Sequence, residues 1–322
     1  MQLPFLRQAA LRGGLALGAA LGGPIRAHGQ TMDPHMSALV RFANRGVGRV
    51  NGGLEGLRAR YESGPRWTGL RPERSVAVSA LRIGDLPARQ YLPRGAARAS
   101  VLYFHGGGFI IGSLDSHDPL CRRLARMAGV RVVSVGYRLA PEHPFPAAHE
   151  DAAAAWAWTR ANLPGPLVVA GDSAGANLAA GVALAGEPDL QVLLYPVVDM
   201  LHQDGLYPSI ELFKEGYLLT GEGMRECARL LLPPDQDAAD PRLSPLRADL
   251  SRASPALIAT AGFDPLRDQG LAYAEALRRA GRRVTLLEEP RLVHGYADFA
   301  GVVPEARRAV DRVAAAIRAE LE

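Results

Sequence analysis

Nine residues, Leu167-Val-Val-Ala-Gly-Asp-Ser-Ala-Gly175, set the architecture expected for the whole chain. The apolar first half predicts a buried strand, which leads directly into the G-x-S-x-G element Gly171–Gly175 and then into an Ala-rich, helix-like segment ending near Ala185. A turn this sharp leaves no room for side chains at the two glycine positions. It also strains the serine between them and exposes its hydroxyl. We therefore predict that Ser173 is a nucleophile if suitable partners occur elsewhere.

The first partner lies upstream, where the apolar run Ser100–Phe104 is followed by His105-Gly106-Gly107-Gly108. Successive glycines leave backbone N–H groups unshielded, so that they can converge on a small anion. We assign the donors for such an oxyanion as the backbone N–H groups of Gly107, Gly108 and Ala174. A glycine-rich surface loop is the alternative, but the position directly after a strand and before the G-x-S-x-G element argues against it.

A general base for Ser173 must be a histidine, because the ordinary pKa of imidazole near 6.5 lets it take and return a proton around neutrality. The chain has eight histidines. We select His294, which lies between the strand-like run 283–288 and the last helix-like segment. The other seven lie in the glycine loop, where bracing is the expected role, among turn residues, in the N-terminal segment or in a linker-like stretch: His28, His35, His105, His117, His143, His149 and His202.

The acid that orients the histidine should lie between serine and histidine in chain order. Asp264 meets this condition, because it follows the apolar run Pro255–Ala261 and stands just beyond the end of a predicted strand. Asp268 is one competitor, although its place at the start of a helix-like segment suggests a capping charge. Asp199, which follows the strand-like run 190–196, is the second competitor. Our prediction is the order Ser173, Asp264, His294.

Together these motifs identify a resemblance to the bacterial hormone-sensitive-lipase-like esterases of the α/β-hydrolase fold. The resemblance extends from about residue 33 to the C-terminus. The residues that carry it are His105–Gly108, Gly112–Asp118, Tyr137–Pro146, Gly171–Gly175, Leu194–Asp199, Glu215–Thr220, Asp264–Asp268 and His294-Gly295. One departure is Ala176, where the family often has a second glycine, and it puts no role in doubt. The resemblance implies a small helical cap over the site, built from residues 33 to about 72 and an insertion near 200–232.

Strand-like and helix-like patterns alternate along the chain from residue 75. Apolar runs of strand length occur near residues 75–82, 89–93, 100–104, 131–136, 167–171, 191–195, 256–261 and 283–288. Helix-like runs occur near residues 117–128, 147–162, 174–185, 222–232, 268–280 and 304–321. Such alternation is typical of an α/β fold with a mostly parallel sheet and helices on both faces. We expect eight strands, of which the first two form an antiparallel hairpin at the edge.

Composition is that of an ordinary globular enzyme rather than a nucleic-acid-binding protein. The chain has 322 residues, of which 48% are hydrophobic, and a net charge of +4. That charge is spread out, without basic blocks interleaved with aromatic residues, so nucleic-acid binding has little support. Cys121 and Cys227 are too few for a disulfide scaffold, and no Cys/His cluster has metal-ligand spacing. We expect no metal or organic cofactor.

The N-terminal 31 residues are predicted to be an extension, either weakly signal-like or disordered. Arg7 and Arg12 precede the run Gly13–Ile25, which has the length of a signal-peptide core and is too short to span a membrane. Met32 begins a segment that resembles the family's usual start, so we expect one catalytic domain over residues 32–322. A cytoplasmic location without stable membrane insertion is the prediction, and export is the alternative. A homodimer is compatible with the sequence.

The expected activity is hydrolysis of an ester by a Ser-His-Asp triad through an acyl-enzyme intermediate. The resemblance implies small-molecule esters with short-to-medium acyl chains. An amidase, a deacetylase or a lactonase would use the same groups, and the sequence alone does not separate these classes. A non-catalytic ligand-binding relative is disfavoured, because Ser173, Asp264 and His294 are all present.

Overall fold

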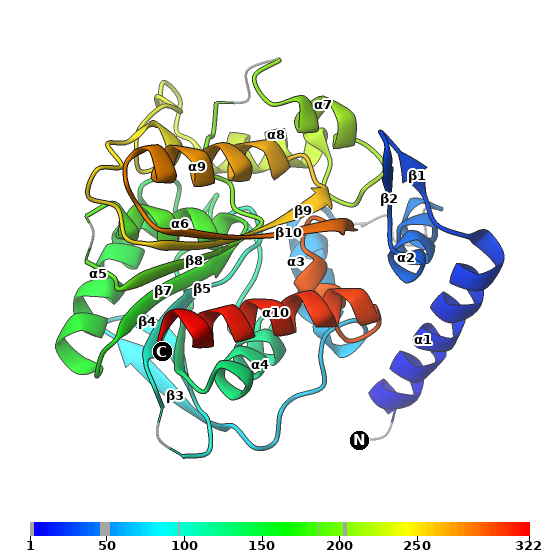
Figure 1. Ribbon diagram of the computed structural model, residues 1–322, viewed down its shortest axis with the longest axis horizontal. Coiled ribbons are helices and arrows are strands. Elements are labelled where there is room, and N and C mark those ends of the chain that lie inside the picture. The colour runs from blue at the N-terminus through cyan, green and yellow to red at the C-terminus, as the bar shows by residue number, and fades with distance from the viewer. Residues whose placement is uncertain (1–2, 46–51, 96, 186, 202–204) are drawn as a thin grey trace.

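An eight-stranded sheet forms the centre of the molecule, with helices on both of its faces (Figure 1). The computed structural model describes residues 3–45, 52–95, 97–185, 187–201 and 205–322. The strands lie in the order β10-β9-β8-β7-β5-β6-β4-β3. The predicted mostly parallel α/β-hydrolase sheet is therefore confirmed.

The strands follow the predicted apolar runs closely. They are β3 (Ala77–Ile83), β4 (Leu86–Leu92), β5 (Ser100–Phe104), β6 (Arg131–Val135), β7 (Leu167–Asp172), β8 (Leu190–Leu194), β9 (Ala256–Phe263) and β10 (Val284–Val293). Strand β3 pairs antiparallel with β4, and β4 pairs antiparallel with β6. The remaining pairs are parallel. The carboxyl ends of six parallel strands thus meet at one edge of the sheet, where α/β folds place their sites.

Two groups of helices cover the sheet. Helices α4 (Asp118–Ala128) and α10 (Pro304–Glu320) pack on one face, as seen below the sheet in Figure 1. The opposite face is covered by α5 (Ala147–Asn162), α6 (Ala174–Ala183) and α9 (Arg267–Arg279). The remaining helices lie nearer the carboxyl edge: α2 (Pro34–Asn44), α3 (Gly53–Ser63), α7 (Pro208–Phe213) and α8 (Gly221–Leu231).

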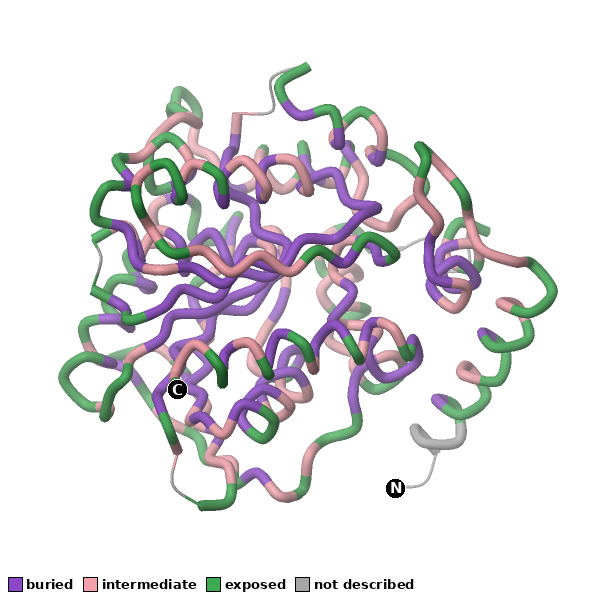
Figure 2. The backbone as a smooth tube through the Cα atoms, viewed as in Figure 1, coloured by how far each residue is buried: buried purple, intermediate pink, exposed green. Residues whose placement is uncertain are grey.

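The sheet separates two hydrophobic cores, because successive side chains of a strand point to opposite faces. In β7, Val168 and Ala170 join the core beneath α4 and α10, while Val169 joins the core beneath α5, α6 and α9. All three side chains are completely buried. Figure 2 shows the same pattern for the sheet as a whole, whose central strands are buried along their length. A continuous apolar run therefore reads as a strand covered on both faces.

Strand β10 is longer than the predicted run 283–288. Its parallel pairing with β9 is irregular between Glu289 and Val293, and the strand resumes there opposite Phe263. The sequence Glu-Glu-Pro-Arg at residues 288–291 breaks the apolar pattern, so the continuation had no signal in hydrophobicity. It is this continuation that delivers the chain to His294.

Residues 3–31 form helix α1 (Leu3–Gly22) and a small hairpin of β1 (Arg26–Ala27) and β2 (Gln30–Thr31). Helix α1 lies at the edge of the molecule beside α2 (Figure 1). Its Gln8 side chain donates to the Gly69 carbonyl at 2.7 Å, and Arg12 donates to the Gly301 carbonyl at 2.6 Å. Within the described residues, no helix has the length and hydrophobicity needed to cross a membrane.

The domain boundaries remain predictions. Parts of the expected cap, residues 46–51 and 202–204, lie outside the described residues. The described parts of residues 33–72 and 200–232 include helices α2, α3, α7 and α8.

Candidate active site

Ser173 occupies the sharp turn between β7 and α6, with φ 53° and ψ −117°. A positive φ is costly for a residue with a side chain, and such strain concentrates at functional sites. The turn depends on its glycines, since a methyl group at Gly175 would collide with the carbonyl oxygen of Phe104, and one at Gly171 would collide with the backbone of Gly175. The backbone N–H of Ser173 donates to the Leu194 carbonyl of β8 at 2.9 Å.

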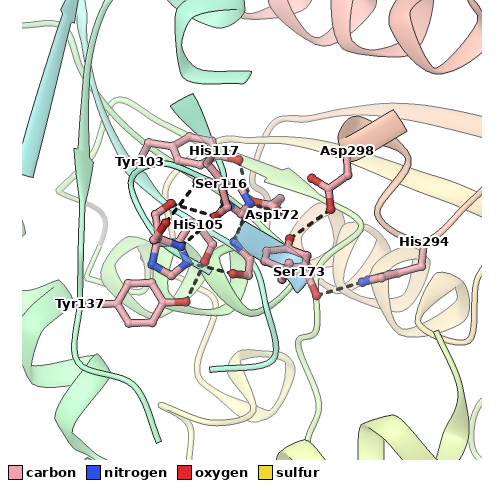
Figure 3. A network of polar contacts seen from close by, with 12 residues as sticks. Tyr103, His105, Ser116, His117, Tyr137, Asp172, Ser173, His294 and Asp298 are labelled. Carbon is pink, nitrogen blue, oxygen red and sulfur yellow. Dashed lines mark hydrogen bonds and ion pairs between the residues drawn. The ribbon is translucent and has the colours of Figure 1, made fainter. Parts of the chain in front are cut away.

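The structure brings Ser173, His294 and Asp264 together in one chain of hydrogen bonds. His294 Nε2 lies 2.9 Å from Ser173 Oγ, and His294 Nδ1 lies 2.9 Å from Asp264 Oδ2 (Figure 3 shows the contact between His294 and Ser173). The Asp264 side chain is completely buried, and its other oxygen accepts from the backbone N–H of Leu266 at 2.8 Å. This carboxylate can therefore fix one tautomer of the imidazole and leave Nε2 to accept a proton from Ser173.

The two competing carboxylates are engaged elsewhere. Asp199 forms an ion pair with Arg247 at 2.9 Å and accepts from the Tyr207 hydroxyl at 2.6 Å. Asp268 accepts from the backbone N–H of Ser209 at 2.7 Å, which ties α7 to the start of α9. Among the described contacts, neither carboxylate meets His294.

The glycine loop after β5 faces Ser173 across the same pocket. Gly107 and Gly108 have φ values of 119° and 59°. A side chain at Gly107 would collide with the Ile111 carbonyl, and one at Gly108 would collide with the Cys227 sulfur. Across the described turns and loops, the N–H groups of these two glycines donate to no protein acceptor. The N–H of Ala174 stands in the first turn of α6, where helical N–H groups lack intrahelical partners.

A buried carboxylate, Asp172, lies directly behind the glycine loop, and the sequence patterns predicted no role for it. Asp172, the residue before Ser173, accepts from the backbone N–H of Gly106 at 2.9 Å and from the Tyr103 hydroxyl at 2.7 Å. His117 Nε2 lies 3.2 Å from the same oxygen, Oδ1. These contacts, drawn in Figure 3, fix the loop against the end of β7. The available signal was a charged residue ending an otherwise apolar strand.

His117 and Asp172 lie at ion-pair distance, and each favours the charged form of the other. Burial alone would disfavour both charges, but the carboxylate of Asp172 raises the pKa of His117, and His117 in turn lowers the pKa of Asp172. The second nitrogen of His117 lies 2.9 Å from Ser116 Oγ, whose hydroxyl donates to the Ser113 carbonyl at 3.0 Å. This direction of donation lets Ser116 Oγ accept from His117 Nδ1, while the backbone N–H of Gly106 also points at His117 Nε2 at 3.3 Å.

His105, which we expected to brace the loop, lies in surroundings that favour its neutral imidazole. Burial and the neighbouring charge of His117 lower the pKa of His105 to about 3. Its Nδ1 lies 2.9 Å from the Gly106 carbonyl, and its ring stacks on Tyr137 with the centroids 4.3 Å apart. The Tyr137 hydroxyl donates to the His105 carbonyl at 2.7 Å. These contacts support the bracing role.

A cavity of about 400 Å³ opens over Ser173 and is lined mostly by apolar side chains. Its floor is formed by the strand ends and the glycine loop, and its walls by α3, α8 and the segment before α8. The wall residues include Leu57, Tyr61, Leu218, Met224 and Cys227. The volume lies in the range of small-molecule sites.

One acidic group on the cavity wall was not predicted. Asp298 lies four residues beyond His294, and burial raises the pKa of its carboxyl to about 6. It accepts from the Tyr61 hydroxyl at 3.1 Å. Asp298, Ser173 and His294 line the same cavity, and all three are labelled in Figure 3. No pattern in the sequence distinguished this residue, because it follows the histidine in a short turn.

Known proteins resemble this chain over most of its length. A family model described as the alpha/beta hydrolase fold matches residues 101–298. The carboxylic ester hydrolase LipN of Mycobacterium tuberculosis is 44% identical over 274 residues, which span 78% of this chain and 72% of LipN. The ethyl acetate hydrolase of Pseudomonas putida is 41% identical over 254 residues, which span 73% of this chain and 79% of that protein.

Solved structures agree with these relatives. The hyperthermophilic esterase from the archaeon Pyrobaculum calidifontis superimposes with a TM-score of 0.81 at 36% identity, and the match covers 89% of this chain and 98% of that structure. The carboxylesterase EstE1, cloned from a metagenomic library, superimposes with a TM-score of 0.76 at 39% identity, covering 84% and 98%. This chain therefore belongs to the α/β-hydrolase fold and, within it, to the hormone-sensitive-lipase-like esterase family that its motifs indicate.

Proposed function

We propose that this carboxylic ester hydrolase cleaves small-molecule esters with Ser173 as nucleophile, His294 as general base and Asp264 as the orienting acid. The observation that carries the proposal is the unbroken hydrogen-bond chain from Ser173 Oγ through His294 to the buried Asp264, with 2.9 Å at each step. These are the contacts that a serine nucleophile and its base require.

The reaction proceeds in two halves. Ser173 Oγ attacks the ester carbonyl carbon while His294 Nε2 takes its proton. The negative charge that develops on the carbonyl oxygen is met by the N–H groups of Gly107, Gly108 and Ala174, which is the largest single contribution expected from the site. His294 then returns the proton to the departing alcohol and leaves an acyl group on Ser173. A water molecule then attacks the acyl carbon while His294 takes its proton. The bond to Ser173 Oγ breaks, His294 returns the proton to Ser173, and the acid leaves.

Acyl esters of about four to eight carbons are the proposed substrates, a length taken from the family resemblance. The mostly apolar cavity of about 400 Å³ supports an acyl chain rather than a charged acyl group. A relative at 41% identity is named for the hydrolysis of ethyl acetate, which carries a short acyl group. Each methylene that the cavity buries adds about 0.8 kcal/mol until the chain reaches the wall.

Covalent labelling tests the proposal. An organophosphate should modify Ser173 and block hydrolysis of p-nitrophenyl butyrate, with the adduct located by mass spectrometry. Ser173→Ala is the matched control, and it should lose both the label and about 10⁴-fold of activity while remaining folded. An adduct at Ser113 or Ser244 would contradict the assignment of the nucleophile.

A panel of substrates distinguishes ester hydrolysis from the hydrolysis of other acyl compounds, such as amides and lactones, by the same triad. We expect p-nitrophenyl esters with acyl chains of two to sixteen carbons to give a maximum at about four to eight. Activity that rose steadily to sixteen carbons and increased at an oil–water interface would instead identify a lipase. Faster turnover of matched amides or lactones than of esters would reassign the substrate class.

The remaining proposals concern location and assembly. We place the enzyme in the cytoplasm, with export through residues 1–31 as the alternative. Recovery of protein cleaved near residue 30 from a culture medium would support export. A homodimer remains a prediction, testable by light scattering.

A further inference from the structure

A second cavity lies next to the one over Ser173. It has a volume of about 580 Å³, is partly open to solvent and is bounded by α1, α2 and α3 together with the short turn after α3. Its lining is dominated by apolar and aromatic side chains: Leu11, Leu39, Phe42, Leu57, Pro65, Trp67, Leu218 and Phe299. None of the three residues in the proposed triad lines it.

The two cavities share one wall. Five residues line both of them: Leu57, Tyr61, Leu218, Asp298 and Phe299. Tyr61 is fixed in this wall by the hydrogen bond of 3.1 Å from its hydroxyl to Asp298. The Tyr61 side chain therefore lies between the two cavities, and this hydrogen bond holds its hydroxyl there.

Several of the polar groups that line the second cavity have partners within the protein, and the exposed Arg60 also lines it. The Arg7 guanidinium lies over the Trp67 ring at 5.0 Å, and the hydroxyl of Thr68 donates to the Gly64 carbonyl at 3.2 Å. The Ser63 hydroxyl donates to the Arg60 carbonyl at 2.8 Å. The cavity therefore presents mainly hydrocarbon to an occupant, which favours a chain of methylenes over a polar ligand.

We propose that the second cavity extends the acyl site and that Tyr61 sets the acyl length at which substrates are refused. This inference rests on the proposed function, because the ester carbonyl must be held at Ser173 for the acyl chain to point at the shared wall. With Tyr61 in place, the chain ends in the first cavity. When the ring is removed, further methylenes enter the space between α1, α2 and α3.

Chain-length profiles of wall variants test the proposal. In Tyr61→Ala, the ratio of kcat/KM for the twelve-carbon to the four-carbon p-nitrophenyl ester should rise at least tenfold, since each methylene that finds room contributes about fourfold. Leu57→Ala opens the same wall without touching the hydrogen bond and should shift the ratio in the same direction. It also keeps the test decisive if Tyr61→Ala fails to fold.

A variant that fills the second cavity is the matched control. Ala43 lines the second cavity but not the cavity over Ser173. Ala43→Phe in the wild-type background should leave the whole chain-length profile unchanged. In the background of Tyr61→Ala or Leu57→Ala, it should return the ratio toward the wild-type value.

Three outcomes would overturn the proposal. The first is that Tyr61→Ala and Leu57→Ala fold but leave the ratio of twelve-carbon to four-carbon kcat/KM unchanged. The second is that the rise in this ratio persists when Ala43→Phe is added. The third is a loss of long-chain activity in Ala43→Phe alone, which would mean that Tyr61 does not close the wall. Failure of the proposed function would look different, because it would abolish hydrolysis of the four-carbon ester and labelling of Ser173 in the wild-type enzyme.

Discussion

Two buried aspartate–histidine pairs stand at the carboxyl edge of the same sheet. Asp264 follows β9 and meets His294, and Asp172 ends β7 and meets His117. Both carboxylates are almost completely inaccessible and both accept a backbone N–H. Judged by residue types and burial alone, either pair could supply two of the three members of a catalytic triad.

The third partner separates the two pairs. His294 places its second nitrogen on the strained Ser173 and keeps a side-chain exposure of 10% in a cavity. His117 places its second nitrogen on Ser116 and has an exposure of 1%. A base must exchange protons with a reacting group, which requires access. The same pair of residues can thus activate a nucleophile or hold a loop, and the surroundings decide which.

Of the substitutions at the two aspartate–histidine pairs, Asp264→Asn should cause the larger loss of activity. The amide can present an N–H to His294, which favours the wrong tautomer, so kcat should fall by about 10⁴-fold while the fold is retained. Turnover of p-nitrophenyl butyrate and circular dichroism measure the two effects. A loss below about tenfold would show that Asp264 does not orient the base.

Asp172→Asn should act mainly on stability. It leaves the buried charge of His117 without its partner, and breaking a buried ion pair costs about 3 kcal/mol. Because Asp172 also holds Gly106, the glycine loop should shift and kcat should fall about tenfold, less than the loss of one oxyanion donor. Urea unfolding and turnover of the same ester provide the readouts. A greater loss of activity than in Asp264→Asn would reverse the roles of the two pairs.

The coupling between Asp172 and His117 should depend on pH in both directions. The pKa of Asp172 is lowered from 3.8, so its contribution to stability is present above pH 3.8 and is lost as pH falls through the folded pKa. The pKa of His117 is raised from 6.5, so its contribution is present below pH 6.5 and is lost as pH rises through the folded pKa.

A double-mutant cycle with Asp172→Asn and His117→Gln measures the coupling energy between the two side chains. The coupling energy from urea unfolding should be greatest between about pH 4 and pH 6.5 and should decrease on both sides. A coupling that stayed constant from pH 4 to pH 9 would show that the pair is not ionic.

The comparison of the two pairs also shows which features could be predicted from the sequence and which could not. The strands were predictable, because parallel strands buried on both faces give continuous apolar runs such as Val168–Ala170. Ser173, Asp264 and His294 could be predicted because each follows a strand end in a fixed chain order. The three side chains form a contact chain in the order Ser173, His294, Asp264, with each step within hydrogen-bond distance, and their catalytic roles stay a prediction.

The support of the site was harder to predict. Asp172 contacts Gly106 and His117, which are 66 and 55 positions away in the sequence, and such contacts leave no local periodicity. Helix α7 is only six residues long, too short for a helical period to be recognised. The wall formed by Tyr61 and Asp298 joins residues 237 positions apart.

The smallest effect should come from carboxylates at the same edge that have no histidine partner. Asp268→Asn retains an oxygen that can accept from Ser209 and removes only a half-buried ion pair with Arg267. Such pairs contribute about 1 kcal/mol or less, so kcat/KM should stay within threefold of wild type. Asp199→Asn should also stay within threefold in kcat/KM, although it loosens the buried pair with Arg247 and should lower the melting temperature. A catalytic carboxylate at this edge of the sheet is proposed to be the one whose histidine partner contacts Ser173. If either variant lost more activity than Asp264→Asn, this criterion would be wrong.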